Sequence, residues 1–303
     1  MTPLEQSRIM IVGLVRNCAS TLINDLDVLN RAFDQAKEIS FFIVESDSTD
    51  RTVEILQKIS NNRSNFNFIS LGNLQDSYPK RTDRIARCRN KYLNYIENLD
   101  ASQSVDYVVV VDLDGVNSKL DQQSVKSCWM RRDWDVCTAN QHGPYYDIWA
   151  LRHALWSPND CWQQARMMRS LGLSRFKSIW SSVYARMITI PKNADWIEID
   201  SAFGGLAIYR RRALLSCKYV GLNNLGQEVC EHVSFHQQMR SNGCGIFINP
   251  LLINGGIVEH AIPATNYGLI KFYFYCYVCD IAVYFQIEHF LKRVRSYFGC
   301  MKD

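Results

Sequence analysis

The stretch YVVVVDLDG, residues 107–115, carries the clearest fold signal in the chain. Residues 107–111 are an uninterrupted run rich in β-branched side chains, which is typical of a strand buried on both faces of a sheet. Such strands occur in parallel sheets that helices cover on both sides. We therefore expect a central strand here, with the polar residues 112–115 at its carboxyl end.

Upstream of this strand, apolar runs alternate with segments that carry apolar residues at helical spacing. The runs predict strands at 8–15, 39–44 and 66–71, and the spacing predicts helices at 20–37, 51–59 and 82–99. This alternation is typical of a doubly wound, mostly parallel α/β sheet. Ligands bind such sheets beyond the carboxyl ends of the strands, where the candidate residues are Arg16, Asn17, Glu45 and Ser46.

The composition is that of a globular protein. The 303 residues include 34 Lys+Arg and 30 Asp+Glu, and 47% are hydrophobic, which excludes a disordered chain, a fibrous repeat and a disulfide-stapled miniprotein. The net charge of +4 is too small to argue for a nucleic-acid partner, whereas anionic small ligands remain open.

The cysteines indicate a reducing compartment. Eleven are scattered without the paired spacing of a zinc site, and the first residues lack the layout of a secretion signal. We therefore expect free thiols and a cytoplasmic protein. Cys276 and Cys279 have the spacing of a redox pair, but without a βαβ context we interpret them as core cysteines.

Asp112 and Asp114 follow the 107–111 strand as a carboxylate pair. Residues i and i+2 of extended backbone point to the same side, so both carboxylates can face one cation, and Gly115 lets the chain turn away. Two carboxylates completed by substrate phosphates suit a hard divalent ion such as Mg²⁺ or Mn²⁺. A helix cap followed by a turn explains the same residues equally well.

The same four residues, 112–115, also fit the opening motif of haloacid-dehalogenase-type phosphatases. There the first Asp is a nucleophile and the second a general acid. Such an enzyme has this motif at its first core strand and a later acidic pair for magnesium. Here more than a hundred residues of βαβ pattern come first and no later acidic pair is found, so this interpretation ranks second.

Two upstream motifs carry a family resemblance. VESDSTDRT, residues 44–52, resembles the acidic loop after the second strand of GT-A-fold nucleotide-sugar glycosyltransferases, and RIARCRN, residues 84–90, resembles the Arg/Asn helix that precedes their DxD motif. The order of motifs over residues 8–115 is most similar to the fungal capsule-associated mannosyltransferase-like group. The resemblance implies a GT-A fold, with Glu45 at the nucleoside and Asp112 and Asp114 on a metal that bridges the donor diphosphate.

The leaving nucleoside diphosphate is anionic, so arginine side chains near it would stabilise the developing charge. Arg84 and Arg87 share one face of the predicted helix and Arg89 points elsewhere, so at most two can reach one phosphate pair. Solvated helix arginines are the alternative. The expected donor-binding residues are Arg16, Asn17, Glu45, Ser46, Arg84, Arg87, Asn90, Asp112, Leu113, Gly204 and Gly205.

Aromatic rings mixed with polar groups after residue 140 suit a sugar pocket, because rings pack on pyranose faces. We expect Tyr146, Asp147 and Arg152 to bind the acceptor, and we interpret Trp149 and Trp156 as core.

Residues 175–191 lack a clean period and are expected to form a lid or an acceptor loop. Gly204 and Gly205, between strands at 196–200 and 206–209, permit close backbone approach to a ligand and resemble the Gly-Gly loop beneath the transferred sugar.

EHVSFHQQMRSNG, residues 231–243, resembles the Glu-Asp helix of inverting family-2 glycosyltransferases. His232 occupies the position where the family has the Asp that acts as general base. Glu231 or His232 is therefore the expected catalytic base, unless the reaction is retaining. An acidic residue at a helix N-terminus explains Glu231 as well. His260 lies where family members place a late metal-binding His, and a structural His is the alternative.

We expect one GT-A-type catalytic domain over residues 1–268, with a nucleotide-sugar-binding half at 8–139, an acceptor half at 140–268 and a helical tail at 269–303. Residues 271–287 are aromatic but too short and polar to predict a membrane-spanning helix. From Ile287 onward the pattern is that of a basic amphipathic helix, which either packs on the catalytic domain or lies on an anionic membrane.

These patterns together predict a metal-dependent glycosyltransferase, of the hexosyltransferase class, that uses Mn²⁺ or Mg²⁺. It would transfer a sugar from a UDP- or GDP-sugar to the hydroxyl of a glycan or of a lipid-linked acceptor, without binding nucleic acid. The alternatives are the magnesium-dependent phosphatase and a non-catalytic carbohydrate-binding or scaffold protein.

Overall fold

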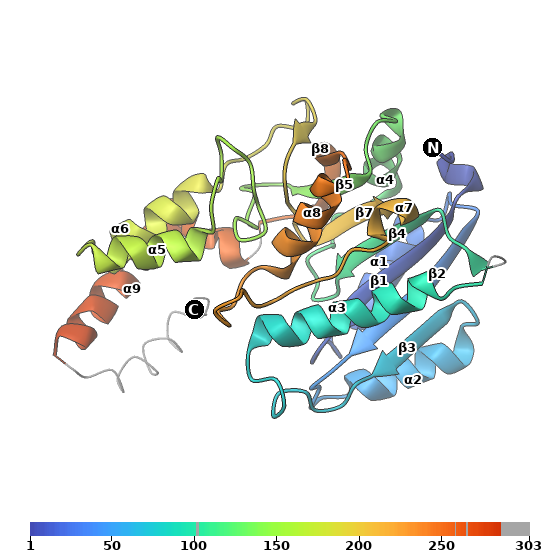
Figure 1. The fold of residues 1–303 in the computed structure, drawn as a ribbon, viewed down its shortest axis with the longest axis horizontal. Helices are drawn as coiled ribbons and strands as arrows, with labels where there is room; N and C mark the ends of the chain where they lie inside the picture. Colours follow the sequence, from blue (N-terminus) through green and yellow to red (C-terminus); the bar gives the residue numbers. More distant parts are fainter. Residues whose placement is uncertain (101–102, 258, 265, 286–303) are drawn as a thin grey trace.

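The computed structural model describes residues 1–100, 103–257, 259–264 and 266–285, which form an eight-stranded sheet flanked by helices (Figure 1). The strands, in their order across the sheet, are β3 Phe66–Ser70, β2 Glu38–Glu45, β1 Arg8–Val15, β4 Tyr107–Asp112, β7 Leu206–Arg210, β5 Val136–Gln141, β8 Ile246–Gly255 and β6 Ile197–Glu198. Strands β3, β2, β1 and β4 are parallel to one another, as are β5 and β8, whereas β7 and β6 are antiparallel to their neighbours. The predicted mostly parallel α/β sheet is confirmed.

Strand β4 is buried on both faces, as its sequence predicts. Val108 and Val110 belong to one hydrophobic cluster and Val109 and Val111 to another, because successive side chains of a strand point to opposite faces. All four side chains are fully buried. The two clusters are the two halves of the core, one on each side of the sheet.

Helices cover both clusters (Figure 1). α3 (Arg81–Glu97) and α8 (Glu231–Ser241) contribute to the first cluster, and α1 (Leu22–Ala32), α2 (Thr52–Asn62) and α4 (Gln122–Ser127) contribute to the second. The short element η1 (Leu4–Gln6) precedes β1, and η3 (Cys128–Met130) and α7 (Arg211–Leu214) lie in connections between strands. The predicted helices near 20–37, 51–59 and 82–99 are thus present as α1, α2 and α3; α1 is shorter than expected, α2 extends three residues further, and α3 has nearly the expected bounds.

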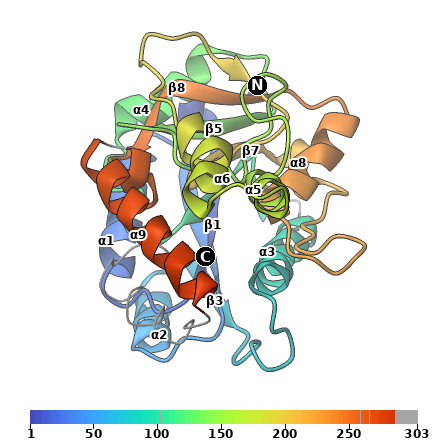
Figure 2. The same cartoon turned by 90° about the vertical axis from the view of Figure 1, so that its left-hand side faces the viewer.

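A separate layer of helices lies beside the sheet and contains α5 (Cys161–Ser170), α6 (Arg175–Ser182) and α9 (Asn266–Tyr284) (Figure 2). The expectation of a lid or loop over 175–191 is wrong for its first half, which is α6, followed by η4 (Tyr184–Arg186). The Ser174 hydroxyl accepts a hydrogen bond from the Lys177 N–H at the start of α6. Phe176, at helical spacing from Ile179 and Trp180, then packs against α9.

Helix α9 follows η5 (Glu259–Ala264) and is joined to the layer by an ion pair. The Arg169 Nη1 lies 2.9 Å from Asp280 Oδ1, and the Arg175 N–H donates to Asp280 Oδ2 at 3.1 Å. Among the described residues no helix is long and apolar enough to cross a membrane. The amphipathic pattern expected from Ile287 onward lies outside the described residues.

His236 joins α8 to the sheet through a fully buried imidazole. Its Nδ1 lies 3.0 Å from the Ser201 hydroxyl and its Nε2 lies 2.8 Å from the Tyr209 hydroxyl. Burial, reinforced by the charge of Arg89, lowers the pKa of His236 from 6.5 to about 3. The ring is therefore neutral in the folded protein, where one nitrogen donates a hydrogen bond and the other accepts one.

The depressed pKa of His236 predicts acid sensitivity. As the pH falls below 6.5 the unfolded chain binds a proton on His236 that the folded chain does not bind until about pH 3. The free energy of unfolding should therefore fall with pH, by up to about 1.4 kcal/mol per pH unit from this group. Urea unfolding of wild type and His236→Gln across this range should show a shallower decline for the variant. His142→Gln, at an exposed position, is the control, and parallel curves for wild type and His236→Gln would contradict the assignment.

Candidate active site

Strand register brings several sequence motifs to one edge of the sheet. Val15 at the end of β1 is paired with Glu45 of β2, and Leu14 is paired with Asp112 of β4. Strand β7 is antiparallel to β4, so its first residues lie at the same edge, where the Asp112 N–H donates to the Gly205 carbonyl at 3.0 Å. Motifs almost a hundred residues apart are thus hydrogen-bonded neighbours.

Asp112 and Asp114 point away from the core. The Asp112 side chain is 39% exposed and Asp114 is exposed, whereas Leu113 between them is 1% exposed and packs in the core. Gly115 has φ = 90°, and its N–H donates to Asp25 Oδ2 of α1 at 2.9 Å. The carboxylates are therefore arranged as the alternation of extended backbone predicts, and the Leu113 side chain is a core contact.

Negative charge accumulates around Asp112. Although 39% of the Asp112 side chain is exposed, loss of hydration at its carboxyl raises the pKa to about 7, and the carboxylates of Asp114, Asp147 and Glu231 act in the same direction. The Arg89 guanidinium opposes them without restoring the ordinary value. A cation bound between these carboxylates would relieve this repulsion.

A divalent ion at this edge would need oxygen or nitrogen ligands from nearby side chains. Among the described residues, no three His, Cys, Asp or Glu side chains form a group that could hold a metal ion by themselves. Asp112 and Asp114 nevertheless fit the sparse carboxylate set of Mg²⁺ and Mn²⁺, which take their remaining ligands from water and phosphate. His260 belongs to η5, but its side chain lies outside the described part of the chain, so its metal role stays a prediction.

Arg89, a candidate for charge stabilisation that is absent from the expected donor-binding set, lies at the site. It is 4% exposed, its Nε donates to Glu231 Oε1 at 3.0 Å, and its Nη2 lies 3.6 Å from Asp112 Oδ1. Its guanidinium carbon also lies 5.3 Å and 5.5 Å from the ring centroids of Phe203 and Tyr219. The helical repeat shows that Arg89 faces away from Arg84 and Arg87, but only the packing of α3 shows that this is the face toward the carboxylates.

Glu231 and His232 lie at the start of α8 and differ in their surroundings. Glu231 is paired with Arg89, whereas neither ring nitrogen of His232 has a hydrogen-bond partner among the described residues. His232 is 3% exposed, stacks on Phe203 at 3.9 Å between centroids, and has its Nε2 3.8 Å from Glu231 Oε1. Burial, with the nearby charge of Arg89, lowers its pKa well below 6.5, so the ring is a weak base.

Gly204 and Gly205 both have positive φ, at 68° and 83°. The Gly204 N–H donates to Asp147 Oδ2 at 3.0 Å. A Cβ on Gly204 would come within 2.7 Å of Gln141 Nε2, and one on Gly205 within 2.9 Å of the Tyr146 hydroxyl. These close approaches are to protein atoms, and electrostatic interactions of Asp147 and Tyr146 with Asp112 show that both lie near its carboxylate.

The loop after β2 uses its polar groups internally. Glu45 is 1% exposed, and its carboxylate accepts hydrogen bonds from the Ser48 N–H and the Ser70 hydroxyl. The Asn17 side-chain oxygen accepts from the Thr49 N–H, and Arg16 Nη2 donates to Gln75 Oε1 at 3.2 Å. The Ser46 hydroxyl accepts a hydrogen bond from the Cys88 thiol at 3.5 Å. Contacts of these four residues with a donor stay a prediction.

The other predicted residues of α3 make contacts away from the carboxylate pair. Arg84 donates to the carbonyls of Tyr78 and Pro79 and lies 3.7 Å from Asp47, while Arg87 is exposed and pairs with Asp83 at 3.2 Å. Asn90 exchanges two hydrogen bonds of 2.9 Å with the backbone of Tyr219. These are contacts within the protein, and donor binding by the three residues stays a prediction.

Arg152 has a comparable structural setting. Its Nη1 donates to the carbonyls of Trp149 and Leu151, and its Nη2 lies 3.5 Å from Asp160 Oδ2. Of the three expected acceptor residues, the structure thus brings Tyr146 and Asp147 to the Asp112 edge and directs the Arg152 guanidinium to backbone carbonyls and Asp160.

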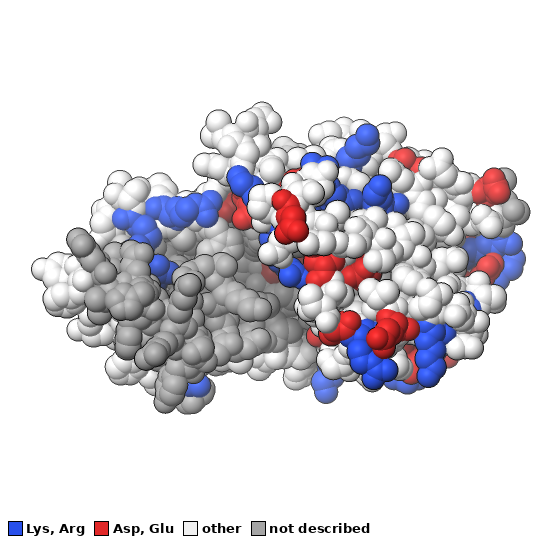
Figure 3. Space-filling model, turned by 90° about the horizontal axis from the view of Figure 1, so that it is seen from below, with Lys and Arg blue, Asp and Glu red and all other residues white. Residues whose placement is uncertain are grey.

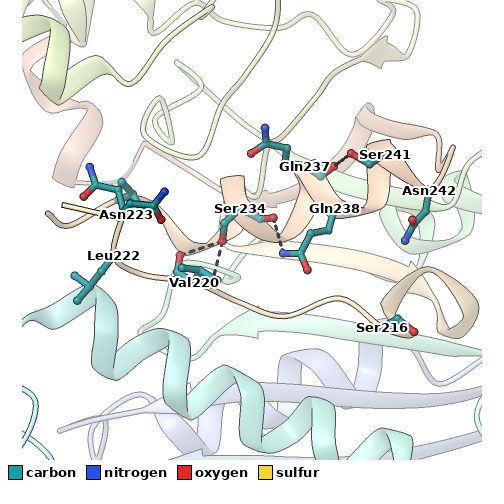
Figure 4. Close-up of a pocket in the computed structure, with 11 residues that line it drawn as sticks. Ser216, Val220, Leu222, Asn223, Ser234, Gln237, Gln238, Ser241 and Asn242 are labelled. Atoms are coloured by element: carbon teal, nitrogen blue, oxygen red, sulfur yellow. Dashed lines mark hydrogen bonds between the residues drawn. The ribbon is translucent and has the colours of Figure 1, made fainter. Parts of the chain in front are cut away.

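A groove of about 650 Å³ lies on α8 and the segment before it (Figure 4). Ser234, Gln237 and Ser241 of α8 line one side, and Val220 and Asn223 of the preceding segment line the other. None of the residues predicted from the sequence lines this groove. Since it holds no ionisable side chain, it lacks the chemistry of the Asp112 edge, which we take as the candidate active site.

Comparison with known proteins gives structural similarity only. No protein-family profile and no curated protein matches the chain. S. aureus TarS 1–349 is 14% identical over 85% of this chain and 63% of its own, with a TM-score of 0.47. The mannosyltransferase PcManGT from Pyrobaculum calidifontis, in complex with GDP-Man and Mn²⁺, is 14% identical over 96% of this chain and 65% of its own, with a TM-score of 0.47. This chain thus spans less than two thirds of either protein.

A third similar structure is that of glucosyl-3-phosphoglycerate synthase from Mycobacterium tuberculosis in complex with UDP. It is 14% identical over 84% of this chain and 72% of its own, with a TM-score of 0.38. The resemblance to the fungal capsule-associated group finds no counterpart among these structures.

The buried pair of Arg89 and Glu231 predicts strong energetic coupling. Arg89→Gln should lower the free energy of unfolding by about 3–5 kcal/mol, because it leaves carboxylates buried without their cation. Adding Glu231→Gln should recover part of that loss, with a coupling energy of about 1–3 kcal/mol in a double-mutant cycle followed by urea unfolding.

The matched control is the exposed pair of Arg51 and Glu54, whose Nε to Oε2 distance is also 3.0 Å. Its double-mutant cycle should show no measurable coupling, because water screens exposed charges. Additive effects of Arg89→Gln and Glu231→Gln would show that the buried pair does not act as a unit.

Proposed function

We propose that the chain is a glycosyltransferase that moves a sugar from a nucleoside-diphosphate sugar to an acceptor hydroxyl. The observation that carries this proposal is the carboxylate pair of Asp112 and Asp114 at the carboxyl end of the central strand, with Glu231 and Asp147 beside it. A hard cation and an anionic diphosphate suit this arrangement, since each compensates the charge of the other. The motif resemblance over residues 8–115 supports the same reaction class.

Asp112 and Asp114 would hold the Mn²⁺ or Mg²⁺ ion. When bound, the ion supplies positive charge that stabilises the leaving diphosphate. The exposed carboxylate of Asp114 is open to solvent, so the remaining positions of the ion can be filled by phosphate oxygens. Tyr146 and Asp147, which lie near the Asp112 carboxylate, are placed to contact the sugar or the acceptor.

Glu231 is the better candidate for the catalytic base. Burial lowers the pKa of His232 well below its ordinary value, so its ring is a weak base. The Arg89 contact orients the Glu231 carboxylate toward the Asp112 edge. His232, stacked on Phe203, would then position Glu231 rather than take up the proton, and the reaction would be inverting.

The finer assignments follow from the sequence. They are a UDP- or GDP-sugar as donor, a glycan or lipid-linked hydroxyl as acceptor, and a cytoplasmic location with peripheral membrane contact through the segment from Ile287 onward.

The proposed membrane contact of the segment from Ile287 onward is tested in the full chain by Phe290→Ser with Leu291→Ser. Unchanged binding to anionic vesicles would reject it.

Removing either metal-binding carboxylate should abolish metal-dependent donor binding. Asp112→Asn or Asp114→Asn should weaken binding of UDP or GDP in the presence of Mn²⁺ by about tenfold or more, measured by thermal shift, with little change in the metal-free melting temperature. Asp195→Asn, at an exposed position on another surface, is the control. Wild-type affinity and turnover in both variants would rule out this mechanism.

The same variants separate the phosphatase alternative. A phosphatase of the haloacid-dehalogenase type would lose activity with Asp112→Asn and would form a phosphoaspartate at Asp112 in the wild type. A trapped phosphoaspartate, together with the absence of any metal-dependent preference for nucleoside diphosphates, would favour that enzyme class.

Replacing the base should affect turnover more than donor binding. Glu231→Gln should lower kcat by about two orders of magnitude with nucleotide affinity nearly unchanged, because a general base acts on the acceptor in the transition state. His232→Gln should lower kcat by less than about tenfold if its role is positioning. A larger loss for His232→Gln than for Glu231→Gln would transfer the role of base to His232.

A further inference from the structure

Helix α9 has two apolar faces, and the described residues of the chain cover only one of them. The covered face, which includes Phe272, Tyr275, Cys276 and Cys279, packs on α6. The opposite face carries large side chains that are 37–81% exposed, at helical spacing: Ile270, Tyr273, Phe274, Tyr277, Ile281, Tyr284 and Phe285. A helix that is apolar all round normally has apolar surroundings on every side.

The exposed face is large for a monomeric protein. At roughly 200 Å² for each fully exposed large side chain, these seven expose on the order of 800 Å². The largest apolar patch of a typical monomer is about 300–600 Å². An exposed apolar helix face of this size therefore indicates an apolar partner.

The layer that carries this face is basic. Helices α5, α6 and α9 contain the basic residues Arg166, Arg169, Arg175, Lys177 and Lys271, and their only acidic residue is Asp280. This net charge of +4 equals that of the whole chain, so the other residues are neutral in sum. In Figure 3 the coloured side chains at the left-hand end, where this layer lies, are Lys and Arg.

We propose that the outward face of α9 rests on an anionic lipid membrane, to which the net positive charge of α5, α6 and α9 is attracted. Tyr273, Tyr277 and Tyr284 combine an apolar ring with a polar hydroxyl, which suits the boundary between lipid headgroups and acyl chains. The basic residues are attracted to anionic headgroups. Because the other face of α9 is packed on α6, the helix lies in the interface and does not enter the bilayer.

This surface is formed by residues that precede Ile287 in the sequence, and lipid binding does not depend on the glycosyl transfer proposed above. Its function would be to hold the Asp112 edge near a membrane, where lipid-linked acceptors are found. Vesicle binding can be measured without substrate, so failure of this inference and failure of the proposed activity are separate results.

The apolar contribution is tested with the full chain carrying Phe274→Ser and Tyr277→Ser, which are 56% and 57% exposed. Cosedimentation with phosphatidylcholine vesicles containing phosphatidylglycerol should show affinity reduced by about tenfold or more relative to wild type. The matched control is Met130→Ser with Leu225→Ser, which are 78% and 82% exposed elsewhere on the surface and should bind as wild type.

The electrostatic contribution is tested with Arg166→Gln and Lys177→Gln, both at exposed positions. Their affinity for the same vesicles should fall by about tenfold at low salt and approach that of wild type at high salt. Lys58→Gln with Lys91→Gln removes the same charge from other exposed positions and should have little effect.

Three results would overturn the inference. The first is wild-type vesicle affinity of the Phe274→Ser and Tyr277→Ser variant. The second is equal binding of wild type to vesicles with and without phosphatidylglycerol. The third is a wild-type dimer in sedimentation that the α9 variant abolishes while vesicle binding is unchanged, which would identify a second copy of the chain as the partner.

Discussion

The buried guanidinium of Arg89 is the constraint on which the candidate site depends. A charge that is 4% exposed is costly unless it is paired, and its partners are Glu231 at 3.0 Å and Asp112 at 3.6 Å. These residues come from α3, α8 and β4, so the Arg89 guanidinium fixes the relative position of three elements. It also allows several carboxylates to lie close together, although the pKa of Asp112 remains raised to about 7.

Around this charge centre, a fully buried polar network supports the backbone of the site. Asn254 of β8 donates to Asn117 Oδ1 at 2.9 Å and to the Gly204 carbonyl at 2.8 Å, and Asn117 in turn donates to the Asp112 carbonyl at 2.7 Å. Such networks are rigid because each unpaired group would carry a desolvation cost. The carboxylates are therefore supported by side chains from distant segments, as a preorganised site requires.

The local patterns were sufficient for the fold and for part of the site. The β-branched run 107–111, the preceding strand and helix alternation and the exposed pair of Asp112 and Asp114 follow from periods of two and 3.6 residues, which depend on neighbours in sequence. The same reasoning predicted no helix over residues 175–191. The spacing of Phe176, Ile179 and Trp180 is recognised as the apolar face of a helix only once their contact with α9 is known.

The sequence by itself determined the sheet, the strand ends and the residue types that meet there, since these depend on local backbone preference and alternation. Only the tertiary structure decided which arginine faces the carboxylates, because the helical repeat separates Arg89 from Arg84 and Arg87 without showing which face is inward. It also decided that Glu45 is enclosed by Ser48 and Ser70, and that one apolar face of α9 is left uncovered. Burial and charge pairing depend on elements far apart in the chain, and a local pattern does not contain them.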